Sequence, residues 1–127
     1  MNTRHGRSRA AAGVLVALAV AGWLLALGSH AAQERRREVS VSARKYAFTP
    51  PVIEVDQDDV VRITLTAEDI PHSFTIDAYR IAKRASPERP AVFEFQADQP
   101  GSFRIYCNLQ IDEKCRDMSA TLVVRPR

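Results

Sequence analysis

The sequence predicts an all-β fold of about seven or eight short strands, preceded by one hydrophobic helix at the N-terminus. Composition supports the strands, because the chain after residue 32 holds 16 valine and isoleucine residues against three leucines, together with eight aromatic residues. Alternating apolar and polar runs are separated by proline, glycine and aspartate turns, and no window shows helical periodicity. Short strands at this spacing indicate an antiparallel sandwich or barrel.

Residues 1–32 differ from the rest of the chain in composition. The 18 residues 10–27 carry no charge, and three arginines and no acid precede them. As a helix this stretch would be about 27 Å long, a length between that of a signal-peptide core and that of a membrane span. A small-residue cleavage site stands at 29–31. The leader is therefore predicted to be either a cleaved signal peptide or a membrane anchor, and both place the domain in the periplasm or another extracytoplasmic compartment.

Residues 33–38 are expected to be a solvated linker into a domain at 39–127. All 15 acidic residues and all but three of the 18 basic residues follow residue 32, so the two kinds of charge balance after the leader. This balance argues against a nucleic-acid-binding protein. The domain has one histidine, and the sequence offers no Ser–His–Asp set. We therefore expect that the chain is not an enzyme.

Three strands are expected in the first half of the domain. Residues 38–43 read EVSVSA, and 52–55 form a short apolar run after a Pro-Pro turn. The acidic turn at 56–59 leads into 60–66, which reads VVRITLT. Alternation with a period of two is the pattern of a strand that buries one face.

Four more strands are expected in the second half. Residues 72–78 read HSFTIDA and 91–97 read AVFEFQA. A Pro-Gly turn leads into 102–107, and the last strand is expected at 118–124. The polar segment 79–89, YRIAKRASPER, is expected to be a surface connection with at most one short strand.

The same alternation places three chemically active side chains on apolar strand faces. Residues two apart share a face of a strand, and His72, Cys107 and Met118 each fall in phase with apolar neighbours. All three stand at the ends of expected strands, where a site can open toward one pole of a sandwich.

Imidazole, thiolate and thioether together favour copper, because soft sulfur ligands suit this metal. Other interpretations stay open at this point. His72 and Met118 can be core residues, and two cysteines in an exported domain most often form a disulfide. Zinc on His72, Cys107 and Cys115 would leave Met118 without a role.

Two motifs and the spacing of three residues narrow these interpretations. Residues 68–74 read EDIPHSF, and 100–107 read PGSFRIYC. Cys107 follows His72 by 35 residues, and Met118 follows Cys107 by 11. In these features the stretch 67–124 resembles the copper domain of subunit II of haem–copper cytochrome c oxidases and small periplasmic cupredoxins. The YAFTP segment at 46–50 is also similar to small cupredoxins.

The resemblance implies a cupredoxin-like Greek-key β-sandwich whose metal ligands are His72, Cys107, Cys115 and Met118. Ile111 stands where the family has its second bridging cysteine, and Cys115 stands where it has its second histidine. A mononuclear copper site is therefore expected, and a dinuclear copper centre is not.

Asp69, three residues before His72, is expected to orient the imidazole through its second nitrogen. A solvated turn residue is the alternative interpretation of Asp69.

Two hypotheses follow for the function. In the first, the protein is an exported copper protein, held at the membrane if the leader is an anchor, which passes electrons or copper to an exported partner. In the second, Cys107 and Cys115 form a disulfide, and the metal-free sandwich serves as an accessory binding module.

Overall fold

The computed structural model describes residues 34–127. The expected leader at 1–32, with its hydrophobic helix, lies outside these residues. Within the described part, no helix is long and apolar enough to span a bilayer.

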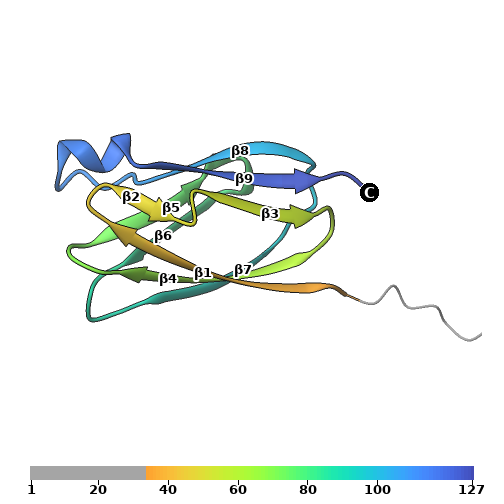
Figure 1. The fold of residues 1–127 in the computed structure, drawn as a ribbon, viewed down its shortest axis with the longest axis horizontal. Coiled ribbons are helices and arrows are strands. Elements are labelled where there is room, and N and C mark those ends of the chain that lie inside the picture. The colour runs from red at the N-terminus through yellow and green to blue at the C-terminus, as the bar shows by residue number, and fades with distance from the viewer. Residues whose placement is uncertain (1–33) are drawn as a thin grey trace, which may run out of the picture. The chain divides into compact units, whose positions relative to one another are not determined.

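Nine strands and two short 3₁₀ helices make up the described part of the chain (Figure 1). In order they are β1 (Arg36–Arg44), β2 (Ala47–Thr49), β3 (Val52–Asp56), β4 (Val60–Ala67), β5 (His72–Ile76), η1 (Asp77–Tyr79), β6 (Ile81–Ala85), β7 (Ala91–Gln96), β8 (Gly101–Tyr106), η2 (Glu113–Asp117) and β9 (Ser119–Arg125). The expected all-β class is confirmed.

The strands form two sheets that pack as a sandwich (Figure 1). The first sheet has the order β2-β1-β4-β7 and the second has the order β3-β9-β8-β5-β6. The expectation of a wholly antiparallel fold is wrong for two pairs, because β1 runs parallel to β4 and β3 runs parallel to β9. At Pro50 and Pro51 the chain leaves the first sheet after β2 and enters the second sheet at β3. Because of this crossing, β4 returns to the first sheet in the same direction as β1.

Alternation correctly predicts which side chains form the core. In β4 every second residue is buried, as at Ile63 and Leu65, and β9 shows the same pattern. Three aromatic rings connect the two sheets. The Phe74 ring of β5 contacts Phe48 of β2 and Phe93 of β7, with ring centroids 6.2 Å and 5.4 Å away. All nine strands and this core lie within residues 34–127.

The polar segment 79–89 contains one short strand, β6, at the edge of its sheet, which agrees with the expectation of at most one short strand there. Three local features differ from the expected elements. β1 begins at Arg36, inside the stretch expected to be a linker, and β2 was not among the expected strands. The expected strand at 72–78 ends at Ile76, and all five residues of β5 are buried. β5 has strands on both sides, which explains why it lacks an exposed face.

We predict that Phe74→Ala lowers the free energy of unfolding of residues 34–127 by about 3–5 kcal/mol, because it empties the contact between the sheets. Urea denaturation followed by circular dichroism measures this change. Val92→Ala is the control, since Val92 is 53% exposed and its truncation is expected to cost less than about 0.5 kcal/mol. Equal losses in the two variants would contradict this view of the core.

Candidate metal centre

The order of the second sheet brings three predicted site residues to one end of the sandwich. β8 lies between β9 and β5 and runs antiparallel to both. Its last residue pairs with the first residue of β9 and with a residue of β5. Cys107 directly follows β8, Met118 directly precedes β9, and His72 begins β5.

The predicted ligand residues are all withdrawn from solvent. The exposed fraction is 0% for Cys107 and Met118, 1% for His72 and 3% for Cys115. Cys115 lies in η2, whereas the other three residues lie at the ends of strands. Burial on this scale excludes bulk water from competing for these side chains.

Cys107 and Cys115 are joined by a disulfide, with their Cα atoms 5.2 Å apart. The segment between the two cysteines folds back into η2, where the Asp112 side chain accepts a hydrogen bond from the Lys114 amide at 2.9 Å. Tyr46, in the turn between β1 and β2, donates its hydroxyl to the same carboxylate at 2.5 Å. These contacts hold the cysteine loop against the sandwich.

Asp69 lies directly beside the imidazole of His72, as the sequence predicted. The Nε2 atom of His72 and the Oδ1 atom of Asp69 are 2.7 Å apart. The carboxylate also accepts hydrogen bonds from the backbone amides of Lys45 and Ile70, both at 2.7 Å. Burial raises the pKa of Asp69, but these three hydrogen bonds outweigh it and lower the pKa to about 2. Asp69 is therefore an ionised acceptor at physiological pH.

An ionised carboxylate can only accept, so Nε2 of His72 carries the proton that is donated to Asp69. The other ring nitrogen, Nδ1, is buried and has no hydrogen-bond partner among the described residues. An unpartnered buried polar atom costs free energy. Nδ1 of His72 is thus the imidazole nitrogen that no described residue contacts by a hydrogen bond, and an imidazole nitrogen of this kind is a common metal ligand.

Two polar residues that the sequence reasoning missed connect the ends of β5 and β8. The Ser73 amide donates to Sγ of Cys107 at 3.5 Å. The Ser73 hydroxyl donates to the Asn108 side chain at 2.7 Å and accepts from the Asn108 amide at 2.8 Å. Ser73 and Asn108 directly follow His72 and Cys107 in the sequence, but their pairing depends on the register of β5 against β8.

The donor set fits copper in one redox state of the cysteine pair. Sulfurs joined in a disulfide offer no thiolate, and within residues 34–127 no group of three or more His, Cys, Asp and Glu side chains is arranged to hold a metal ion. Reduction would release two thiol groups at the end of the sandwich where the free Nδ1 atom of His72 lies. Thiolates, a thioether and an imidazole nitrogen form a soft donor set that favours copper.

Comparisons with known proteins agree with this reading of the fold. A family model described as a cupredoxin-like domain matches residues 16–124. Cytochrome c oxidase subunit 2 of Thermus thermophilus is 28% identical over 87 residues, which cover 68% of this chain and 64% of that protein. The chain thus spans less than two thirds of this curated relative.

Two solved structures have a similar fold. The periplasmic domain of subunit II of cytochrome oxidase (CoxB) of Bradyrhizobium japonicum superposes with a TM-score of 0.62 at 16% identity, covering 70% of this chain and 83% of that domain. The second is a mixed disulfide intermediate between a thioredoxin-like protein and subunit II of cytochrome c oxidase. It superposes with a TM-score of 0.59 at 17% identity, covering 70% and 81%.

We predict that reducing the Cys107–Cys115 bond lowers the free energy of unfolding by roughly 2–3 kcal/mol, because the bond closes a loop across a separation of eight residues. Urea denaturation with and without dithiothreitol measures the difference. The double variant Cys107→Ala/Cys115→Ala serves as the control, since dithiothreitol should leave its unfolding midpoint unchanged. If dithiothreitol also leaves the unfolding midpoint of the wild type unchanged, the bond is absent or contributes nothing to stability.

Proposed function

This chain belongs to the cupredoxin-like domain family, and from that premise we propose that it is an exported protein that binds one copper ion. The observation that carries the proposal is the buried Nδ1 atom of His72, which has no hydrogen-bond partner among residues 34–127. This atom lies at the same end of the second sheet as the sulfur-bearing residues Cys107 and Met118.

The ligands in this proposal are His72, Cys107, Cys115 and Met118, with the two cysteines reduced. Bound copper would supply one-electron redox chemistry. The chain itself contributes a rigid end of a β-sandwich and keeps water away through the burial of all four side chains. Asp69 holds the imidazole in the tautomer that leaves Nδ1 free.

One ion is proposed because the chain lacks the second bridging thiolate expected for a dinuclear site. Ile111 occupies that place and is 59% exposed. Cys115 replaces a histidine of the resembled site and is bonded to Cys107 when oxidised. A pair of thiolates at one metal favours Cu(I), which suits copper handling as well as electron transfer.

The disulfide state needs a reductant before copper can bind. In thiol–disulfide exchange, a dithiol partner attacks one sulfur, and a mixed disulfide forms as the first step. The second thiol of the partner resolves it, so that the partner is oxidised to its own disulfide and Cys107 and Cys115 gain two electrons and two protons. The relative captured with a thioredoxin-like protein suggests an exported protein of that class as the partner.

The location proposed for the domain is extracytoplasmic. A relative of the same fold is a periplasmic domain, and a disulfide persists in oxidising compartments. The uncharged stretch at 10–27 would provide the export signal or the membrane anchor.

A second candidate function rests on the disulfide itself. If Cys107 and Cys115 stay bonded throughout the life of the protein, the domain is a metal-free sandwich that acts as an accessory binding module. The direct bond between the two sulfurs is the observation that favours it.

We predict that reduced residues 34–127 bind one equivalent of Cu(I), and that the loaded protein shows intense thiolate-to-copper absorption after oxidation to Cu(II). Cys107→Ser and Cys115→Ser should each shift and weaken these bands, because each removes one of the two thiolate ligands, and the double variant should lose them. Metal analysis after gel filtration measures the stoichiometry.

Ile111→Ala is the matched control for this titration, since it alters the same loop without removing a donor atom. It should bind copper as the wild type does. Two equivalents of copper would contradict the mononuclear site, and no retained copper would favour the accessory module.

We predict that Asp69→Ala weakens copper binding by about tenfold or more, because the carboxylate fixes the tautomer and ring orientation of His72. Competition with a coloured Cu(I) chelator measures the affinity. Glu68→Ala is the control, since Glu68 contacts Ser42 and Arg44 rather than His72.

Nitrogen-15 NMR of the imidazole separates this positioning role from a merely structural one. The wild type should show a protonated Nε2 and a free Nδ1, and Asp69→Asn should restore much of that pattern through its amide oxygen. An unchanged tautomer and affinity in Asp69→Ala would contradict the assignment.

A further inference from the structure

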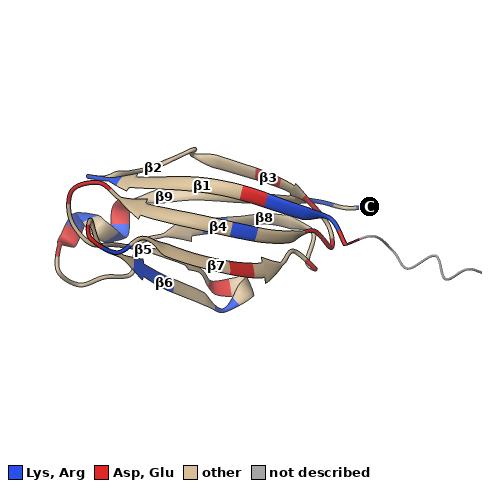
Figure 2. Ribbon diagram, turned by 90° about the horizontal axis from the view of Figure 1, so that it is seen from below, with Lys and Arg blue, Asp and Glu red and all other residues tan. Residues whose placement is uncertain are grey.

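The segment 80–89 concentrates positive charge in a domain whose basic and acidic residues are equal in number overall. It holds four basic residues, Arg80, Lys83, Arg84 and Arg89, against one acid, Glu88. All four basic residues are exposed. β6 shows as a strand with a blue stretch in Figure 2. We call these four residues the basic edge.

The basic edge lacks the ion pairs that five other arginines form, although within residues 34–127 Arg35, Arg37, Arg104 and Arg116 lack them too. Five arginines elsewhere in the described part of the chain lie within 4.0 Å of a carboxylate oxygen, namely Arg36, Arg44, Arg62, Arg125 and Arg127. No residue of the basic edge has such a partner among residues 34–127. Its positive charge is thus not neutralised within the domain.

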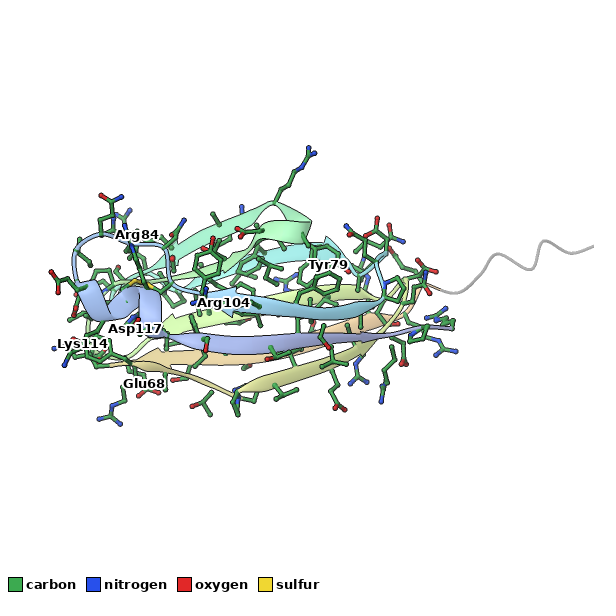
Figure 3. All side chains as sticks on the ribbon, turned by 90° about the horizontal axis from the view of Figure 1, so that it is seen from above. Glu68, Tyr79, Arg84, Arg104, Lys114 and Asp117 are labelled. Atoms are coloured by element: carbon green, nitrogen blue, oxygen red, sulfur yellow. A yellow bond between two sulfur atoms is a disulfide. The ribbon has the colours of Figure 1, made fainter. Side chains whose placement is uncertain are left out.

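Arg84 brings the basic edge next to the candidate metal centre, whereas Arg80 lies at the other end of β6. β6 is the outermost strand of the second sheet and pairs with β5. In that register Arg84 is opposite Ser73, whose amide contacts Sγ of Cys107, and Ala85 is opposite His72. Arg84 lies at the same end of the sandwich as Lys114 and Asp117 of η2 (Figure 3). One strand therefore separates the unpaired charge from the disulfide.

We propose that the basic edge docks the acidic face of a dithiol protein partner that reduces the Cys107–Cys115 bond. This inference rests on the proposed function, in which that bond must be reduced before copper binds. Charge complementarity carries it, because cations without ion-pair partners near a buried disulfide raise the encounter rate of an anionic partner and orient it. The partner is identified by its chemistry, an acidic surface around its own pair of thiols.

Edge strands also carry lysine and arginine for another reason, since charge on an edge prevents two sheets from joining. The two roles differ in the sign of the charge that they need. Protection of the edge works with either sign, whereas an acidic partner needs positive charge. Reversing the charge separates them, because Lys83→Glu/Arg84→Glu keeps a charged edge and removes the attraction.

The test uses the full chain in a mild non-ionic detergent and an acidic thioredoxin as the probe. Reduction of the Cys107–Cys115 bond is followed by timed alkylation and mass spectrometry. At low ionic strength the charge-reversal variant should react about tenfold more slowly than the wild type. The two rates should converge as salt is raised, because screening removes the attraction.

Two controls make the result specific. Arg35→Glu/Arg37→Glu changes the charge equally at two exposed, unpaired arginines around the start of β1, and it should react as the wild type does. Neutral dithiothreitol should reduce all variants at the same rate, which shows that the bond itself is unaltered. Should the charge reversal impair folding, Lys83→Gln/Arg84→Gln should give an intermediate slowing.

Equal rates for the wild type and the charge-reversal variant with thioredoxin, at low salt, would overturn the docking surface. Equal slowing by the control pair would overturn it as well, since net charge alone would then explain the effect. Copper titration of the same reduced samples tests the proposed function separately. One outcome separates the two: the chain binds no copper, yet thioredoxin still reduces its disulfide at a rate that depends on the charge of the basic edge. That result would contradict the copper role and support the docking surface.

Discussion

The antiparallel pairing of β8 with β9 on one side and β5 on the other is the constraint on which the chemistry of this chain depends. Because β8 runs against both neighbours, its last residue meets the first residue of β9 and a residue of β5. Cys107, Met118 and His72 are thereby carried to one end of one sheet, although 46 residues of sequence separate the first and last of them. Phe74 packs against aromatic rings of the other sheet beneath this end. This packing holds the paired strands β5, β8 and β9 in place.

The same sulfur atoms serve two states that exclude one another. When Cys107 and Cys115 are bonded, the loop through η2 is closed and no thiolate is offered. When they are reduced, the proposed copper site gains its sulfur donors, while His72 stays in its tautomer through Asp69. In the proposed function, the histidine side of the site is prepared in either state, and the redox state of the cysteine pair would decide whether a metal can be held. In the same proposal, the basic edge beside β5 would guide the partner that changes this state.

Sequence reasoning predicted the fold class and much of the strand pattern, because alternation with a period of two reports directly on a strand with one buried face. It failed where that premise does not hold. β5 is buried on both faces, and β2 is only three residues long. Parallel pairing of β1 with β4 was missed because alternation carries no information on strand order. For the site, spacing and resemblance brought Cys107 and Cys115 together and placed Asp69 beside His72, but no sequence pattern specifies whether two adjacent sulfurs are bonded. Ser73 and Asn108 were missed because hydrogen bonds between strand ends depend on register.

The most direct test of the central claim is X-ray absorption at the copper edge of the reduced, copper-loaded chain. The account predicts one copper ion whose nearest scatterers are sulfur atoms together with one imidazole nitrogen, and no second copper in its surroundings. Substitution of His72 by alanine should remove the imidazole contribution while the sulfur contribution stays. A spectrum with only nitrogen and oxygen scatterers, or one with a copper neighbour, would contradict the convergence of these side chains on a single ion.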